Sequence, residues 1–348
     1  MSGSSLDGID LALCDLRIED GRWKYRIEKA ETVGYDDDLR SKLIAVMEGT
    51  ALDLARLDVE LGRMIGETCN EFLAGEKADL ISSHGHTIFH KPDEGLTTQI
   101  GSGAQIAAIT GITTVCDLRS MDVALGGQGA PLVPLGEKLL FPEHDTFLNL
   151  GGIANIAVHR ADRLIGYDIG PCNMALNFLS QLVGKMYDEG GRIAAAGTMI
   201  PELFDRLEAL EFYSLAPPRS LGREWFDEQL APLIDEHKWS IHDRMRTVAE
   251  HIASQIAKEL RRHSTGSVMI TGGGAYNSFL IKQIQKMSGS KIKLPEKDLI
   301  EFKEALIFAL LGVLRLRGEV NVLASVTGAR VGSVGGAVYW GSQHSGHG

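Results

Sequence analysis

Cysteine is scarce in this sequence, and long apolar runs are missing. Four cysteines are spread over 348 residues with no Cys-X-X-Cys pair, a pattern typical of reduced thiols rather than of a disulfide framework. No apolar run reaches the roughly 20 residues that span a bilayer, and the N-terminus lacks the basic and apolar segments of a signal peptide. These absences predict a cytoplasmic protein without a membrane partner.

Basic residues are fewer than acidic ones, 35 against 46, which gives a formal net charge of −11. This charge disfavours a nucleic acid or an anionic membrane as partner, but it allows an anionic ligand held by backbone dipoles and a cation. The length favours two domains, which we place at residues 1–143 and 144–348, with the extreme C-terminus returning to the first lobe. Two lobes imply a cleft between them.

Glycine is abundant, with 40 residues, above the usual share of about 7%. The most informative glycines are Gly151 and Gly152, which follow a strand-like run, while Asp168 ends another such run at residues 164–168. Backbone N–H groups of glycine can approach an anion closely, so a carboxylate beside such a cradle suggests phosphoryl transfer. The alternative is a tight hairpin and an aspartate that caps a turn.

Two further glycine-containing segments fit a nucleotide. Residues 2–8, Ser-Gly-Ser-Ser-Leu-Asp-Gly, form a hydroxyl-rich loop before a strand-like run, and Asp7 or Asp10 could hold a hydrated Mg²⁺ there. A disordered tail is the alternative for this loop. Residues 272–274 are three glycines between a strand-like and a helix-like run, an arrangement that lets a planar base or a ribose lie against bare backbone.

Helical patterns are predicted at residues 36–47, 52–73 and 244–262, and residues 102–105 fit a capping box that starts another helix. Glu304 lies on an apolar helical segment, where a carboxylate either faces a cleft or occupies the first turn of the helix.

A histidine cluster offers a rival interpretation. His84 and His86 are two residues apart, so in extended backbone they point to one side, and with His90 and Asp117 they could bind a metal. Such a site would indicate a metal-dependent hydrolase; the alternative is a pair of hydrogen-bonding histidines. Arg119 follows a strand-like run, at the end where α/β sheets bind ligands, and is a candidate for a substrate oxygen or for a surface ion pair.

Five motifs occur in an order that resembles a known family. They are Met-Ser-Gly-Ser-Ser-Leu-Asp-Gly-Ile-Asp at residues 1–10, Ser-His-Gly-His-Thr at 83–87, Gly-Gly-Gln-Gly-Ala-Pro-Leu-Val-Pro at 126–134, Asn-Leu-Gly-Gly-Ile-Ala-Asn-Ile at 149–156 and Ser-Val-Thr-Gly-Ala at 325–329. The sequence resembles the anhydro-N-acetylmuramic acid kinase family over essentially its whole length. The resemblance implies an α/β fold of the two-lobed actin-like ATPase (ribonuclease H-like) type, with a nucleotide cleft between the lobes.

The resemblance also implies a reaction. Members of this family use ATP and Mg²⁺, open 1,6-anhydro-N-acetylmuramic acid with water and transfer the γ-phosphoryl group to O6, which gives N-acetylmuramic acid 6-phosphate in peptidoglycan recycling. Such an enzyme is a phosphotransferase with an alcohol group as acceptor, and it is typically a homodimer. A catalytically impaired sugar- or nucleotide-binding relative is the second hypothesis, and the metal-dependent hydrolase is the third.

The same resemblance implies a role for each candidate residue. Asp168 matches the aspartate of the family's Asp-Thr-Gly-Pro-Gly-Asn motif and would be the general base, while Thr97, Arg119 and Glu304 would contact the sugar. The residues that would hold ATP are Ser2, Gly3, Ser4, Ser5, Asp7, Gly8, Gly151, Gly152, Asn155, Gly272, Gly273 and Gly274.

The sequence departs from the family pattern at several positions. Ser4 replaces Thr, His86 replaces Gln, Ile169 and Cys172 replace Thr and Gly, and Asn177 replaces a second aspartate. The family also has a strand ahead of the first phosphate loop, where this sequence begins. Either the start codon is placed too late or a sheet strand is missing, and loss of a central strand would expose sheet edges and weaken the nucleotide lobe.

Overall fold

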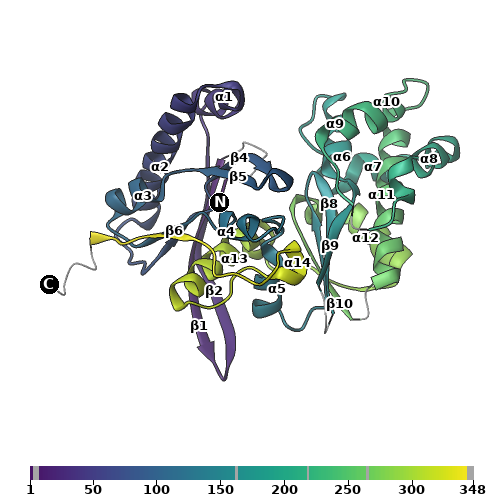
Figure 1. The fold of residues 1–348 in the computed structure, drawn as a ribbon. Helices are drawn as coiled ribbons and strands as arrows, with labels where there is room; N and C mark the ends of the chain where they lie inside the picture. The colour runs from purple at the N-terminus through teal and green to yellow at the C-terminus, as the bar shows by residue number, and fades with distance from the viewer. Residues whose placement is uncertain (3–7, 161–163, 218, 264–265, 343–348) are drawn as a thin grey trace. The chain divides into compact units, whose positions relative to one another are not determined.

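The computed structural model describes residues 1–2, 8–160, 164–217, 219–263 and 266–342. Its contacts divide the chain into two compact units, one of Met1–Phe141 with Phe302–Gly348, the other of Pro142–Glu301. The second boundary falls inside helix α13, where Phe302 leaves helical geometry at φ −115° and ψ 16°. Each unit has a hydrophobic core of its own, and the elements of both are drawn in Figure 1.

The second unit is built on a five-stranded sheet in the order β11-β10-β7-β8-β9. An antiparallel meander joins β7, β8 and β9, whereas β10 runs parallel to both β7 and β11. This topology is that of a ribonuclease H-like unit. The central strand β7 is buried almost throughout, while β8 alternates between buried and half-buried residues. The strands are β7 (Thr146–Leu150), β8 (Ile153–His159), β9 (Leu164–Pro171), β10 (Ser267–Thr271) and β11 (Lys291–Lys293).

Helices of the second unit pack around α11, which contacts β9 and four other helices. Its core residues Val248, Ile252, Ile256 and Leu260 recur every four positions, which places them on one face. The helix confirms the pattern predicted at residues 244–262 and extends it slightly at each end. The helices are α6 (Asn173–Gln181), α7 (Arg192–Ala196), α8 (Pro201–Glu208), α9 (Arg223–Trp225), α10 (Ala231–Ile234), α11 (Ile241–His263) and α12 (Ser278–Ser288), with short 3-10 or π segments at Glu189–Gly191, Glu211–Ser214, Phe226–Leu230 and Gly273–Tyr276.

Strands of the first unit form three small sheets in the described chain, ordered β1-β2, β12-β6-β3 and β4-β5. The long hairpin of β1 and β2 turns at Asp20 and Gly21, whose φ angles of 51° and 72° match the tight turn that follows the right-handed twist of strands. The strands are β1 (Gly8–Glu19), β2 (Arg22–Gly34), β3 (Ile81–Ser82), β4 (His86–Lys91), β5 (Leu96–Ile100), β6 (Thr114–Cys116) and β12 (Ala337–Tyr339).

The longest helix packed on these strands is α2, which buries Leu57, Leu61 and Ile65 along one face. It begins at a capping box between Thr50 and Asp53. The capping box predicted at residues 102–105 is absent, because the Ser102 side chain makes no cap hydrogen bond to the helix that follows it. The helices are α1 (Asp37–Ala45), α2 (Ala51–Leu73), α3 (Gly103–Thr110), α4 (Ser120–Ala124), α5 (Val133–Leu140), α13 (Lys297–Arg317) and α14 (Ala324–Thr327), with 3-10 turns at Val46–Glu48 and Pro92–Glu94.

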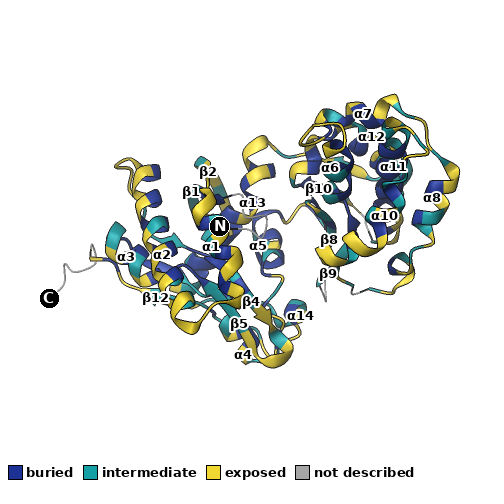
Figure 2. Cartoon of the chain, turned by 90° about the horizontal axis from the view of Figure 1, so that it is seen from above, coloured by how far each residue is buried: buried dark blue, intermediate teal, exposed yellow. Residues whose placement is uncertain are grey.

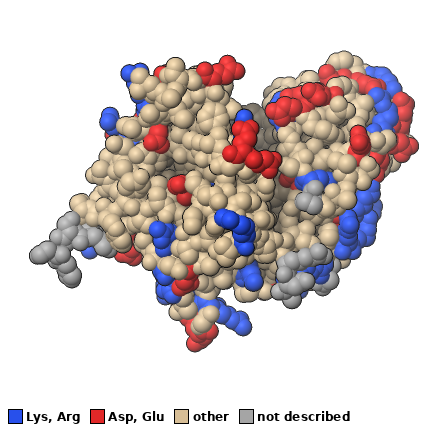
Figure 3. Space-filling view, viewed as in Figure 1, with Lys and Arg blue, Asp and Glu red and all other residues tan. Residues whose placement is uncertain are grey.

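Figure 2 colours the segments of each unit by burial, and buried residues occur on the helices and strands of both units. Acidic and basic side chains both occur on the faces of the two units that Figure 3 shows. Among the helices in the described part of the chain, none is long and apolar enough to cross a membrane.

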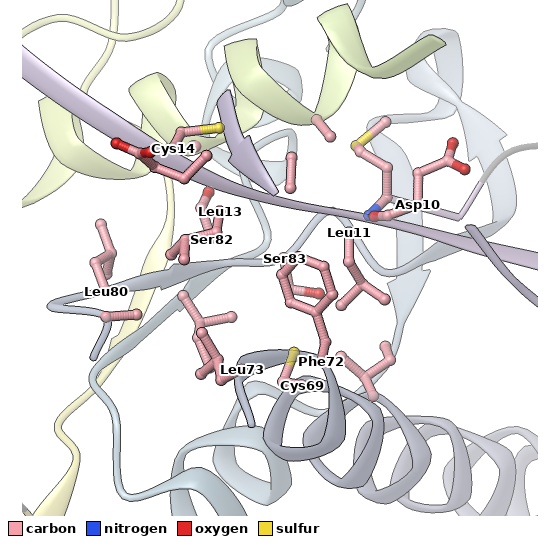
Figure 4. A pocket seen from close by; sticks show the side chains of 18 of the residues that line it. Asp10, Leu11, Leu13, Cys14, Cys69, Phe72, Leu73, Leu80, Ser82 and Ser83 are labelled. Atoms are coloured by element: carbon pink, nitrogen blue, oxygen red, sulfur yellow. The ribbon is translucent and has the colours of Figure 1, made fainter. Parts of the chain in front are cut away.

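A cavity of about 500 Å³ separates β1 from β3 in the first unit. Side chains from β1, β3, α2 and α13 line it, including Leu11, Phe72 and Ser82 (Figure 4). At one end, the Met1 ammonium group donates to Asp10 O over 2.7 Å, and Asp10 N donates to Met1 O over 2.8 Å. Because β2 occupies the other edge of β1, this pairing lies on the edge of β1 that borders the cavity.

Candidate functional site

Two predicted nucleotide-binding segments meet at one end of the second unit's sheet. Gly151 and Gly152 connect β7 to β8, and Gly272 follows β10, which is the parallel neighbour of β7. A Cβ atom on Gly272 would lie 2.4 Å from Asn149 Oδ1 and 2.8 Å from Leu150 C, and φ at Gly272 is +82°. Only glycine permits this approach without strain, so the two turns are in close contact.

The first residue of helix α6, Asn173, contacts the same turns. Asn173 Nδ2 donates to Leu150 O over 2.8 Å, and Asn173 N donates to Gly151 O over 3.1 Å. A Cβ on Gly274 would lie 3.1 Å from Asn173 Oδ1. The glycine backbone of the two turns therefore lies beside the N-terminus of α6. Such an environment suits phosphate oxygens. Asn155, also predicted at the nucleotide, pairs in register with Asn149.

Asp168 lies on the edge strand β9, opposite Asn155 of β8. The register shifts next to this pair, so that Ile169 is the extra residue of a β-bulge, a feature that often re-aims a side chain beside an active site. The strand runs on to Pro171 because the ladder resumes after the bulge. The prediction that it ends at Asp168 is therefore wrong by three residues.

The Asp168 carboxylate is partly buried, and burial raises its pKa. Two hydrogen bonds oppose this effect: Leu221 N and Ser220 Oγ donate to Asp168 Oδ2 over 3.0 and 3.1 Å. A fixed carboxylate with a raised pKa has the properties of a general base. The loop that supplies both donors was not singled out from the sequence as part of the site.

In the first unit, Arg119 is held by two acceptors. Its Nε donates to His84 Nε2 over 3.0 Å, and a terminal nitrogen donates to Gly129 O over 2.8 Å. Burial, and next the Arg119 charge, lower the pKa of His84 to about 3, so the imidazole stays neutral and can accept this hydrogen bond. Arg119 thus belongs to a hydrogen-bonded cluster and not to the surface ion pair that was the alternative.

Thr97 joins the surroundings of Arg119 through His90. The hydroxyl of Thr97 bonds to His90 Nδ1 over 3.0 Å, and Gln99 Nε2 donates to Thr97 Oγ1 over 2.8 Å. The Arg119 charge contributes to a lowered pKa of His90, after burial. Glu304 is exposed on α13, two residues beyond the break at Phe302, and its charge raises the pKa of Arg119 against the larger effect of burial. Thr97 and Glu304, two of the predicted sugar contacts, are therefore both connected to the third, Arg119, within the first unit.

The histidine pair does not form the expected metal site. Gly85 has φ +67°, which interrupts the extended backbone between the two histidines. While His84 bonds to Arg119, His86 Nδ1 bonds to Ser2 Oγ over 2.8 Å. The residues that the structure describes include no group of three or more His, Cys, Asp and Glu side chains that could hold a metal ion. The hydrogen-bonding alternative therefore accounts for both histidines.

Part of the predicted N-terminal phosphate loop, Gly3, Ser4, Ser5 and Asp7, lies outside the described residues. The flanking Ser2 is buried and accepts a hydrogen bond from Tyr35 OH over 2.5 Å. Gly8 begins β1, where a Cβ would come within 2.2 Å of Val33 O.

Asp10 is the described member of the two carboxylates expected near Mg²⁺. Its Oδ1 accepts from Thr32 Oγ1 over 2.6 Å, and among the described residues no side-chain hydrogen bond reaches its other oxygen, which is the one that would bind a metal-bound water. Because Mg²⁺ keeps several waters and combines one or two carboxylates with phosphate oxygens, Asp10 fits this role.

The structural role of one residue, Asp122, was not predicted from the sequence. Asp122 is fully buried and accepts from Gly129 N over 2.8 Å and from Thr327 Oγ1 over 2.7 Å. It thereby joins the motif at residues 126–134 to the motif at residues 325–329. Both motifs were recognised in the sequence, but the aspartate that joins them in the fold precedes both and belongs to neither.

A ribonuclease H-like sheet with glycine turns and a carboxylate at one end defines an actin-like phosphotransferase. The model of one family, anhydro-N-acetylmuramic acid kinase, matches residues 1–341. The chain belongs to the anhydro-N-acetylmuramic acid kinase family, and the predicted family, fold class and enzyme class are confirmed.

Curated relatives bear the same name. The protein named anhydro-N-acetylmuramic acid kinase from Sulfurovum sp. (strain NBC37-1) is 34% identical over 355 residues, covering 97% of both chains. Its namesake from Variovorax paradoxus (strain S110) is 36% identical over 375 residues and covers 97% of both chains. That from Synechocystis sp. (strain ATCC 27184 / PCC 6803 / Kazusa) is 33% identical over 368 residues, with 94% of both chains covered.

Solved structures show a more distant similarity. The activator of the 2-hydroxyisocaproyl-CoA dehydratase from Clostridium difficile with bound ADPNP has a TM-score of 0.43 at 16% identity, over 87% of this chain and 94% of that one. A ROK family glucokinase from Streptomyces griseus in complex with glucose and AMPPNP has a TM-score of 0.37 at 14% identity, over 81% and 94% of the two chains. Scores below 0.5 assign neither a ligand nor an activity to this chain.

Proposed function

We propose that this protein uses ATP and water to convert 1,6-anhydro-N-acetylmuramic acid to N-acetylmuramic acid 6-phosphate in peptidoglycan recycling. Membership of the family named for this kinase supports the substrate. The observation that carries the mechanism is Asp168, a carboxylate with a raised pKa, fixed at a β-bulge in the unit whose glycine turns suit phosphate.

In this mechanism, Asp168 orients a water molecule and accepts its proton as the water oxygen attacks the anomeric carbon. The C1–O6 bond breaks, and O6 forms a new bond to the γ-phosphorus while the bond from that phosphorus to the bridging oxygen of ADP breaks. The products are the 6-phosphate, ADP and one proton. Mg²⁺, held through Asp10 and the phosphates, would supply the charge that offsets the phosphate oxygens.

The other residues serve binding. Gly151, Gly152 and the three glycines at residues 272–274 offer bare backbone to ATP, with Asn155 beside them. In the first unit, Arg119 and Thr97 donate hydrogen bonds to sugar oxygens, and Glu304 accepts from a sugar hydroxyl. Neutral His84 keeps the guanidinium of Arg119 in one orientation.

We propose a homodimer in the cytoplasm. Four free cysteines suit a reducing compartment, and the exposed apolar residues Leu182, Val183, Met186 and Tyr187 after α6 suit contact with a second copy. Sedimentation of the purified protein would measure the oligomeric state, and a monomer at micromolar concentration would contradict the dimer.

The test of the reaction is mass spectrometry of the products formed from Mg-ATP and the anhydro sugar in oxygen-18 water. We expect a phosphorylated sugar with one heavy oxygen. Asp168→Asn should abolish this product but keep ATP binding, whereas Asp205→Asn, an exposed carboxylate on α8, should behave as wild type. Turnover by Asp168→Asn would eliminate Asp168 as the base.

The catalytically impaired relative is the second candidate, and the cavity between β1 and β3 favours it. In the part of the chain that the structure describes, these strands belong to two sheets that do not pair across the cavity, and this loss of pairing weakens the first unit. This candidate predicts binding of sugar or nucleotide, measured by calorimetry, without any product in the oxygen-18 experiment.

A further inference from the structure

Asp168 lies on β9, the edge strand of the second unit's sheet, and a loop that includes residues 219–221 bonds to it there. Asp168 N donates to Arg219 O over 3.0 Å, and Arg219 Nε donates to Asp168 O over 3.2 Å. The next two residues supply the donors to Asp168 Oδ2 described above, Ser220 Oγ and Leu221 N. The loop therefore fixes the backbone and one carboxylate oxygen of the same residue.

The loop itself is anchored by a buried ion pair. Arg219 donates to Glu259 Oε1 of α11 over 2.9 Å, and these side chains are only 5% and 9% exposed. Another nitrogen of Arg219 donates to Leu215 O over 2.9 Å, and the guanidinium lies 5.0 Å from the centre of the Phe212 ring. Charge-assisted hydrogen bonds from a planar guanidinium fix orientation as well as distance.

Glu259 also holds the strand that carries Asp168. Tyr167, the residue before Asp168 in β9, donates its hydroxyl to Glu259 Oε2 over 2.7 Å. One carboxylate of α11 thus binds both the strand and the loop, and Asp168 lies between them. A displacement of this loop would change the direction of the Asp168 carboxylate.

We propose that Arg219, Ser220 and Glu259 are positioning residues that hold Asp168 Oδ2 and leave Oδ1 to take the proton from the attacking water. This inference rests on the proposed function of Asp168 as general base. In the described chain both hydrogen bonds to the Asp168 carboxylate are made to Oδ2. Arg219 does not bond to this carboxylate; its guanidinium forms the buried ion pair with Glu259.

The titratable groups packed around Asp168 are Arg219, Glu259, Tyr167 and, beside Gly170, Tyr213. The pKa of Asp168 is raised by burial and lowered by the two hydrogen bonds from Leu221 and Ser220. Loss of the Ser220 hydroxyl should therefore raise this pKa further, and the acidic limb of the kcat profile should move to higher pH.

The experiment measures kcat and the KM for ATP against pH in the full-length protein. We expect Ser220→Ala to move the acidic limb upward by about one pH unit, since a hydrogen bond to a charged group contributes free energy on that scale. The KM for ATP should stay unchanged, and Ser220→Thr should restore the wild-type profile. Ser214→Ala is the matched control, because the exposed Ser214 hydroxyl bonds only to Glu211 O among the described residues.

Arg219→Lys tests the anchor. Lysine keeps the charge but not the planar fork, so kcat should fall about tenfold or more with an unchanged KM for ATP. If this buried variant does not fold, the exposed Ser220→Ala variant still decides the question. A wild-type kcat profile in Ser220→Ala, or a KM for ATP that changes as much as kcat, would overturn the positioning role.

These outcomes separate the two proposals. Asp168→Asn without activity, together with a wild-type profile in Ser220→Ala, would refute the positioning role and leave the proposed function intact. Activity in Asp168→Asn would refute the general base itself, and with it the role of the loop.

Discussion

Acidification should destabilise the first unit through His84. This side chain is 7% exposed, lies against the ring of Phe308 and accepts a hydrogen bond from Arg119. Its pKa is lowered from 6.5 to about 3 by burial first and then by the charge of Arg119, while its hydrogen bond to Gly85 O opposes these effects and the N-terminus and His86 add to them. A protonated imidazole could not accept the Arg119 hydrogen bond.

The sign and size of the effect follow from proton linkage. Below pH 6.5 the unfolded chain binds a proton at this histidine, whereas the folded chain does not bind one until about pH 3. The stabilisation from neutral His84 is thus complete above pH 6.5 and is lost progressively as the pH falls toward 3. At pH 5 the loss amounts to about 2 kcal/mol, from 1.4 kcal/mol for each pH unit below 6.5.

The assay compares wild type with His84→Gln at pH 7.5 and pH 5.0, using urea denaturation. Because the two units can unfold separately, the first unit is followed by hydrogen exchange in the peptide that contains β6. The amide oxygen of glutamine can accept from Arg119 but does not titrate. Wild type should lose about 2 kcal/mol more than the variant between the two pH values. Equal losses would refute the assignment of a buried, neutral His84.

Three substitutions test other parts of the structure. Gly272→Ala should destabilise the second unit by about 1–3 kcal/mol and weaken ATP binding, because its Cβ would meet Leu150 backbone at a positive φ; wild-type melting and calorimetry would contradict this. Tyr167→Phe should cost about 1.5–3 kcal/mol in urea denaturation, since it removes a hydrogen bond to charged Glu259, and an unchanged midpoint would show that this bond is not stabilising. Asp122→Asn should cost about 1–3 kcal/mol, because one amide group cannot accept from both Gly129 N and Thr327 Oγ1 through its two ends; Asp205→Asn is the exposed control, and equal stability of the two variants would count against the argument.

Local patterns predicted the elements whose structure is determined by nearby residues. The helices at α2 and α11 follow from apolar residues at helical spacing, and β1 from the strand-like run after residues 2–8. The Asp-Gly pair at residues 20 and 21 is also a strong hairpin signal, and it would have joined β1 to β2 from sequence alone. The capping box shows the limit of such reasoning, since residues 102–105 had the right composition, yet the hydrogen bonds form at Thr50 and Asp53.

Contacts between distant residues could not be predicted in this way. Asp168 was identified through a motif, but Ser220 lies 52 positions away and reaches it only through the packing of α11, whose Glu259 anchors the loop. The pattern of His84 and His86 was misleading for a different reason. One glycine with positive φ between them redirects the chain, and a spacing argument that assumes extended backbone fails at such a residue.

Met1 and Ser2 line the cavity beside β1. Met1 and Asp10 form one reciprocal pair of hydrogen bonds, and Ser2 bridges Ile9, so two residues hold the start of the chain to the edge of β1. Burial lowers the pKa of the Met1 ammonium group. The Ser2 hydroxyl also bonds to the side chains of Tyr35 and His86. Under the proposed role of residues 2–8 in binding ATP, the affinity for nucleotide should be sensitive to both hydrogen-bond partners of Ser2.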